Sequence, residues 1–196
     1  MKDLLRENAD LRNELAKLES SRTLAYRDEL TGLWNRLYFT ERLTEELSRA
    51  HRQPRRQVSI MMVDVNDLKA INDAYGHGEG DLVLRWVAEL LERSLRAHDV
   101  ISRVGADEFA VLLPESGVSR AEPLLARLRA ALSETRTGAS FSIGLSFGFA
   151  CYPEDGTTCE QLIRVADDQM HLDKRRQRIL SASPPLPRPL QAAVQT

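Results

Sequence analysis

A run of six apolar or small residues, Val58 to Val63, is the feature that most constrains how this chain can fold. A continuous apolar run of this length predicts a central strand that is buried. Asp64 follows the run, and Asn66 suits the N-cap of a helix. The carboxyl end of a buried strand is where α/β sheets place ligand and metal groups. Asp64 is therefore either a ligand-binding acid or a residue that merely caps the turn, and spacing alone leaves both interpretations open.

A second pattern predicts a β-hairpin. Two short apolar segments, Val100 to Arg103 and Ala110 to Leu113, flank a tip that contains Gly105. The tip also carries adjacent carboxylates, Asp107 and Glu108, and the hairpin would hold them at a fixed point. Paired carboxylates on rigid backbone are what hard cations such as Mg²⁺ require. An Asp-Glu pair in a turn is more often solvated charge, and this pair gains weight only from the acid that ends the first strand.

Helical patterns separate these strands. Helices are expected over residues 35–52, 67–75, 80–97, 119–135 and 158–179, and one more strand within 141–150. Capping residues are expected at Asn35, at Ser119 with Glu122, and at Thr158 with Gln161. Apolar positions at helical spacing are expected to form the core, among them Leu37, Phe39, Leu43, Leu47, Leu82, Val83, Trp86, Val87, Leu90, Leu91 and Leu95. Strands that alternate with helices, plus a hairpin, predict an α/β fold in which helices flank a mixed central sheet.

The two ends of the chain differ from its middle. Residues 1–26 have Leu4, Leu11 and Leu18 at heptad spacing and Asn8 in the same seam, which predicts a parallel coiled coil that makes a homodimer. A solvated amphipathic helix is the alternative. Residues 27–180 are expected to form the folded domain. Residues 181–196 contain four prolines and are expected to be a disordered tail.

Composition limits the class of protein. A chain of 196 residues suits one domain with extensions, and its net charge of −2 implies no strong attraction to nucleic acid. Cys151 and Cys159 are expected to be free thiols. The sequence has neither a visible signal peptide nor an apolar run that approaches the roughly 20 residues of a membrane span. The expected location is the cytoplasm, either as a separate protein or as the cytoplasmic part of a larger sensor.

Four segments, in order, resemble motifs of the GGDEF family of diguanylate cyclases. Asp28 to Arg36 resembles D-x-L-T-x-L-x-N-R, Asp64 to Asp73 resembles D-x-D-x-F-K-x-I-N-D, Gly76 to Asp81 resembles G-H-x-x-G-D, and Arg103 to Phe109 resembles R-x-G-G-D-E-F. The match covers roughly residues 24 to 179. Several spaced motifs in order are specific, whereas any one alone would not be. The resemblance implies the palm-like fold shared with nucleotidyl cyclases and polymerases.

The family reaction joins two GTP molecules into cyclic di-GMP and releases two pyrophosphates. Each 3′-hydroxyl attacks the α-phosphate of the other nucleotide, and cations stabilise the charge that develops. The resemblance implies that Asp64, the carbonyl group of Val65 and Glu108 hold Mg²⁺ or Mn²⁺. Asp107 would assist at the metal or at the attacking hydroxyl. One domain binds one GTP, so the active unit is a homodimer whose coiled coil raises the effective concentration.

The resemblance also assigns substrate contacts. Asn72 and Asp81 would read guanine, because an Asp can accept hydrogen bonds from the N1–H and N2–H₂ groups that adenine cannot match. Lys69, Lys174 and Arg178 would contact the triphosphate. Without the resemblance, Asp81 reads as a charge near a helix N-terminus, and the basic residues near Lys174 read as a helix end that complements the dipole.

Arg96 and Asp99 form an R-x-x-D pattern at the position of the family's inhibitory product site. An Arg can make paired bonds to phosphate or to the guanine edge. Cyclic di-GMP bound there would hold the two domains apart. The alternative is that Arg96 only ends a helix and Asp99 only begins a strand.

The signature departs from the family at one residue. In the segment Gly105 to Phe109, Ala106 replaces the second glycine. If the tip requires positive φ, alanine costs about 1 kcal/mol or more. Elsewhere Asn66 replaces an Asp, Leu68 a Phe and Gln177 a Gly. Activity is expected because the metal, base and phosphate residues remain. The alternatives are a receptor for GTP or cyclic di-GMP, and a coiled-coil dimeriser whose folded domain only docks partners.

Overall fold

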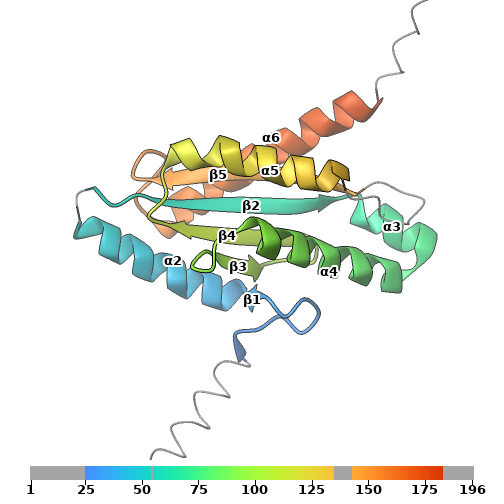
Figure 1. Cartoon of the computed structure of the whole chain (residues 1–196), viewed down its shortest axis with the longest axis horizontal. Coiled ribbons are helices and arrows are strands. Elements are labelled where there is room, and N and C mark those ends of the chain that lie inside the picture. The colour runs from blue at the N-terminus through green and yellow to red at the C-terminus, as the bar shows by residue number, and fades with distance from the viewer. Residues whose placement is uncertain (1–24, 54, 135–142, 183–196) are drawn as a thin grey trace, which may run out of the picture.

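A five-stranded sheet organises the part of the chain that the computed structural model describes, residues 25–53, 55–134 and 143–182 (Figure 1). The strands are β1 (Trp34–Asn35), β2 (Val58–Asn66), β3 (Val100–Arg103), β4 (Glu108–Pro114) and β5 (Gly144–Tyr152), in the spatial order β1-β3-β4-β2-β5. β1 pairs with β3 in parallel, and the other neighbours pair antiparallel. The mixed central sheet predicted from the sequence is confirmed.

Strand β2 is an interior strand between β4 and β5, and all of its residues except Asn66 are buried. Burial on both faces explains the unbroken apolar run. The strand continues two residues past Asp64, so the expected end at Asp64 is wrong. The expected N-cap role of Asn66 is also wrong. The side chain of Asn66 instead accepts a hydrogen bond from Ser146 at 2.8 Å and donates one to Gln177 at 3.0 Å, and Asp67 takes the N-cap position.

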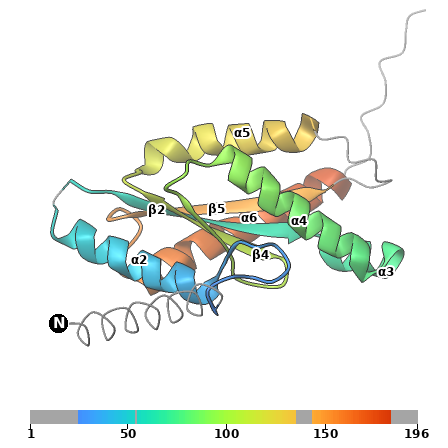
Figure 2. The ribbon, with the colours of Figure 1, turned by 60° about the horizontal axis from the view of Figure 1, so that its bottom comes forward.

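Helices cover both faces of the sheet. They are α2 (Arg36–His51), α3 (Leu68–Tyr75), α4 (His77–Ser94), α5 (Ala121–Glu134), which follows a short 3₁₀ turn at Val118–Arg120, and α6 (Cys159–Ala182). Helices α4 and α5 pack on one face and α2 and α6 on the other, as Figure 2 shows. Each face has its own apolar cluster, because alternate residues of β2 and β4 point to opposite sides. The α/β fold predicted from the sequence is therefore confirmed.

The predicted hairpin is present, because β3 and β4 pair antiparallel from Val100↔Leu112 to Arg103↔Phe109. The N–H group of Val104 donates to the carbonyl group of Glu108 at 2.9 Å, which closes the tip.

Two of the expected helix caps are also confirmed. The side chain of Asn35 accepts from the N–H group of Tyr38 at 3.2 Å, at the start of α2. At the start of α6, the side chain of Gln161 accepts from the N–H group of Thr158 at 3.2 Å. The side chain of Thr158 accepts in turn from the N–H group of Gln161 at 3.3 Å.

Several local expectations are wrong. Leu37 and Leu82 are each 55% exposed, because they lie outside the stripes of α2 and α4 that face the sheet. Helix α4 ends at Ser94, three residues before the expected end. Ser119 lies inside the 3₁₀ turn and α5 begins at Ala121, so the expected capping box does not start this helix.

The ends of the chain are only partly described. The predicted coiled coil lies almost wholly outside the described residues, as does nearly all of the predicted tail, although α6 runs on to Ala182. Cys151 and Cys159 are free thiols, as expected. Within the described ranges, no helix combines the length and the apolar character that a membrane span needs.

Candidate active site

Strand register brings the predicted metal ligands together. Asp64 on β2 lies directly opposite Glu108, the first residue of β4. The N–H group of Val65 donates to the carbonyl group of Asp107 at 2.9 Å, which ties the hairpin tip to β2. Asp64 is 4% exposed, and Glu108 is half-buried. The four residues assigned to the metal and to catalysis therefore meet at one end of the two central strands.

Helix α6 places cations at this cluster. The Nζ atom of Lys174 lies 2.6 and 2.7 Å from the two carboxylate oxygens of Asp64. Arg178, one helical turn further on, lies 3.5 Å from Asp67. Lys69 is exposed on α3. Of the three residues assigned to phosphate, Lys174 thus lies at the carboxylate cluster itself, where it neutralises a buried acid, and Arg178 lies nearby at the start of α3.

The carboxylates near Glu108 repel one another. Burial raises the pKa of Glu108, and the negative charges of Asp167, Asp107 and Asp64 raise it further. Arg36, whose guanidinium lies 3.9 Å from the Glu108 carboxylate, acts in the opposite direction and lowers this pKa. A divalent cation at this position would stabilise the charged form of Glu108, because opposite charge favours ionisation. The cluster therefore has the electrostatic character of a cation site.

Sequence reasoning missed two residues here. Arg36 donates from Nε to the carbonyl group of Val104 at 2.7 Å and so holds the hairpin tip against α2. Asp167 on α6 has a buried oxygen, Oδ1, that finds no hydrogen-bond partner among the described residues, and burial raises the pKa of this carboxyl. Arg36 ends the first of the four motifs, which was the available signal. For Asp167 the only signal was its place in the sequence segment that leads to Lys174.

The donor set fits Mg²⁺ or Mn²⁺. Two carboxylates and a backbone carbonyl group are hard oxygen ligands of the kind that these ions prefer. The ammonium group of Lys174 already occupies a cation position on Asp64. No group of three or more His, Cys, Asp or Glu side chains in the described ranges is arranged to hold a metal. The assigned set has only two such side chains, so the remaining ligands would come from the backbone, from water and from the substrate.

The residues assigned to guanine lie at the corner between α3 and α4. The Oδ1 atom of Asn72 is buried and has no hydrogen-bond partner within the described ranges. It packs so closely on Gly80 that a Cβ atom there would lie 1.9 Å away. Asp81 follows Gly80 and is half-buried. Asn72 thus offers an unsatisfied acceptor beside the helical turn that carries Asp81, which suits recognition of a polar edge.

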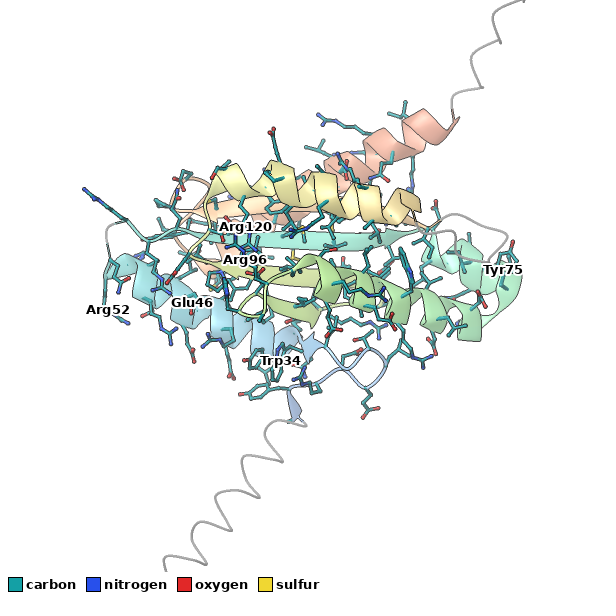
Figure 3. The ribbon with its side chains drawn as sticks, viewed as in Figure 1. Trp34, Glu46, Arg52, Tyr75, Arg96 and Arg120 are labelled. Atoms are coloured by element: carbon teal, nitrogen blue, oxygen red, sulfur yellow. The ribbon has the colours of Figure 1, made fainter. Side chains whose placement is uncertain are left out.

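Arg96 and Asp99 lie close together, and Arg120 joins them. Figure 3 shows Arg96 and Arg120 next to each other. The buried carboxylate of Asp99 accepts a bond from the backbone N–H group of Arg96 at 2.8 Å and two from Arg120 at 3.2 and 2.6 Å. The side chain of Arg96 is exposed at a cavity of about 370 Å³ that Arg27 and Trp34 also line. No pattern in the sequence indicated a role for Arg120 here.

The structure explains how Ala106 is accommodated. Asp67 and Glu115 are the only non-glycine residues with positive φ in the described ranges, so Ala106 has no backbone strain of this kind. Its side chain is exposed at the tip, and its carbonyl group accepts from Arg103 at 2.8 Å. By contrast, a Cβ atom at Gly105 would lie 2.6 Å from a carboxylate oxygen of Glu108. Close approach therefore requires glycine at position 105, whereas position 106 tolerates alanine.

Known proteins resemble this chain in both sequence and fold. MucR of Pseudomonas aeruginosa, a bifunctional diguanylate cyclase/cyclic di-GMP phosphodiesterase, is 39% identical over 76% of this chain. The diguanylate cyclase TpbB of the same organism is 37% identical over 87% of the chain. The chain spans only 22% of MucR and 39% of TpbB.

A solved structure extends the likeness to three dimensions. It contains the coiled coil and GGDEF domain of DgcB from Caulobacter crescentus in complex with c-di-GMP. It superposes with a TM-score of 0.76 and 27% identity, and the match covers 88% of this chain and 93% of that one. The family model described as "Diguanylate cyclase, GGDEF domain" matches residues 25–179, and this chain belongs to that family.

Proposed function

We propose that this domain is a diguanylate cyclase that condenses two GTP molecules into cyclic di-GMP and two pyrophosphates. The observation that carries the proposal is the pairing of Asp64 with Glu108 across two neighbouring strands, with the ammonium group of Lys174 on Asp64. Family membership and relatives that are named diguanylate cyclases support it. The lack of backbone strain at Ala106 supports it as well, since it removes the main reason to expect an inactive tip.

The carboxylate cluster would hold Mg²⁺ or Mn²⁺ through Asp64, the carbonyl group of Val65 and Glu108. When bound, the metal neutralises charge on the phosphate oxygens during attack. Lys174 would then leave Asp64, because a divalent ion competes for the same oxygens. Its long side chain can turn to the triphosphate, where Arg178 and Lys69 add positive charge.

Substrate choice would depend on the α3–α4 corner. Asp81 accepts hydrogen bonds from the guanine N1–H and N2–H₂ groups, and Asn72 adds its unsatisfied Oδ1. Adenine offers no such donor pair, so ATP would leave these acceptors unpaired. An unpaired buried acceptor costs binding energy, which favours GTP.

A homodimer would bring two GTP-loaded domains face to face, through the heptads of residues 1–26. The solved DgcB structure, which includes a coiled coil and c-di-GMP, supports both the helix and the ligand. Product would inhibit by binding the exposed Arg96 side chain. Asp99 already bonds Arg120 twice, so its role there would be to hold the Arg96 loop in place.

The test is turnover of GTP by the purified chain with Mg²⁺, after a phosphodiesterase has removed any bound product. Chromatography should show cyclic di-GMP. The product should disappear in Asp64→Asn and Glu108→Gln variants but persist in Glu89→Gln, a matched change of an exposed acid on α4. GTP binding without turnover would refute the cyclase and favour the receptor. Absence of both binding and turnover in a folded dimer would favour a docking module.

A further inference from the structure

The α2–β2 connection concentrates arginines at the end of the sheet away from the carboxylate cluster. It leads into β2 at Val58, and Asp64 lies six residues further on, about 20 Å along an extended strand. In Figure 3, Arg52 and Glu46 lie at one end of the molecule and Tyr75 at the other. An open cavity of about 690 Å³ is found at this connection, lined by Arg52, Gln53, Arg55, Arg56, Gln57 and Glu115.

A buried acid fixes the arginines on one side of this cavity. Glu46 on α2 is 2% exposed. Its carboxylate lies 3.3 Å from Arg42, 2.7 Å from Arg49 and 2.9 Å from Arg56. Three guanidinium groups share this buried carboxylate, and Glu45 pairs as well with Arg42 and Arg49, as Glu115 does with Arg56. Glu46 therefore holds Arg56 in position at the cavity wall, and the positive charge of the cavity comes from Arg52 and Arg55.

Charge at the cavity is not balanced locally. Arg55 is exposed, and no residue in the described ranges makes an ion pair with it. Arg52 is exposed as well and donates only to the hydroxyl group of Ser48, at 3.1 Å. Glu115 is the one acid in the lining, and it lies 3.3 Å from Arg56. The cavity is thus positive in a chain whose net charge is −2.

An aromatic wall adjoins the arginines. A second cavity of about 440 Å³ shares Gln53, Arg55, Arg56 and Gln57 with the first. His51, Tyr152 and the acid Glu154 also line it. The His51 ring and the Tyr152 hydroxyl group form a hydrogen bond of 2.9 Å, and Gln57 donates to Glu154 at 2.9 Å. Together the two cavities offer guanidinium groups for phosphate and ring faces for a planar group.

We propose that these adjoining cavities form a second anion site, distinct from the active site, that binds a phosphate ester with a planar ring, such as a nucleotide. Arg52 and Arg55 bind the phosphate groups, because their guanidinium groups are exposed and make no ion pair within the described ranges. Arg56 completes the phosphate subsite from a position that Glu46 fixes. Tyr152 and His51 contact the ring. Both volumes fall in the range of small-molecule sites.

The test uses ADP and inorganic pyrophosphate as probes, with EDTA present to remove divalent metal. An adenine nucleotide separates this site from the α3–α4 corner, which is proposed to reject adenine. Amide NMR signals of residues 51–53 and 55–57 should shift on addition of ADP, while signals near Asn72 and Asp81 stay unchanged. ADP should bind more tightly than pyrophosphate because of the ring contact, and added salt should weaken both.

The decisive variant is the double change Arg52→Gln with Arg55→Gln. Both side chains are exposed, so the fold should persist, and thermal unfolding checks this. ADP affinity should fall roughly tenfold or more, as expected for the loss of charge-assisted bonds. The control is Arg93→Gln, an exposed arginine on α4 and on the other face of the sheet, which should leave affinity unchanged.

Three outcomes would overturn the proposal. The first is equal loss of affinity in the Arg93→Gln control, which would indicate nonspecific attraction. The second is ADP-dependent shifts that spread over other arginines or centre on Arg96. The third is equal affinity for ADP and pyrophosphate, which would remove the ring contact and leave only a site for small inorganic anions.

Discussion

Replacement of Lys174 by methionine tests whether its ammonium group substitutes for the metal on Asp64. The ammonium lies 2.6 and 2.7 Å from the two carboxylate oxygens, and the side chains of Lys174 and Asp64 are 20% and 5% exposed. Loss of one partner leaves a buried carboxylate unpaired beside Glu108. Breaking a buried pair in this way costs about 3 kcal/mol or more. For a domain of this size, the melting temperature should fall by roughly 6–12 °C.

Magnesium should reverse much of that loss. In the Lys174→Met variant, Mg²⁺ can bind the vacated oxygens without displacing an ammonium group. A hundredfold excess over the dissociation constant would add about 2.7 kcal/mol. In the wild type the same ion must first break the bonds between Lys174 and Asp64, so its stabilising effect should be smaller. The variant should nevertheless lose turnover, because Lys174 would also bind the triphosphate.

The assay is thermal unfolding in EDTA and in excess MgCl₂, with GTP turnover measured in parallel. The matched control is Lys69→Met, an exposed lysine whose loss should change stability by no more than about 0.5 kcal/mol. If Lys174→Met unfolds at the wild-type temperature, the buried pair contributes nothing. If Mg²⁺ stabilises wild type and variant equally, the ammonium group and the metal do not compete, and the reasoning fails.

Three further perturbations follow from the same geometry. Arg120→Ala should cost roughly 3 kcal/mol in urea unfolding because it strips two bonds from the buried Asp99, and a change below about 0.5 kcal/mol would contradict this. Gly105→Ala should lower turnover strongly because its Cβ would crowd Glu108, whereas Ala106→Gly should leave turnover nearly unchanged; a large gain from Ala106→Gly would show that alanine does hinder the tip. The raised pKa of Glu108 means that the folded state holds this proton to higher pH than the unfolded state does. Without metal, stability should therefore fall as pH rises from the unfolded pKa to the folded one, and Glu108→Gln should reduce that slope in unfolding measurements, leaving the part that the raised pKa of Asp167 contributes.

Local patterns in the sequence were sufficient for much of the fold. The unbroken apolar run marked β2 because a strand buried on both faces has no polar alternation. The caps at Asn35 and at Thr158 with Gln161 could be read directly, since each bond joins residues three positions apart. The same approach failed at Leu37 and Leu82, because helical spacing identifies apolar residues but not which of them face the sheet.

Motif order also made it possible to propose the site residues, but not their contacts. The pairing of Asp64 with Glu108 depends on the register between β2 and β4, and the contact of Lys174 with Asp64 depends on how α6 docks on the sheet. Neither leaves a local trace in the sequence. The roles of Arg120 and Arg36 were invisible for the same reason.

The sequence by itself therefore determined the longer strands, the helices, the caps at Asn35 and Thr158 and the family motifs, because each rests on burial periodicity or on bonds between near neighbours. Only the tertiary structure decided that Lys174 neutralises Asp64, that Arg120 donates two hydrogen bonds to Asp99 and that Glu46 forms ion pairs with arginines beside a cavity. The physical reason is that a charge is stabilised by whatever lies within a few ångströms of it, and strand register and helix docking set those neighbours across long separations in the chain.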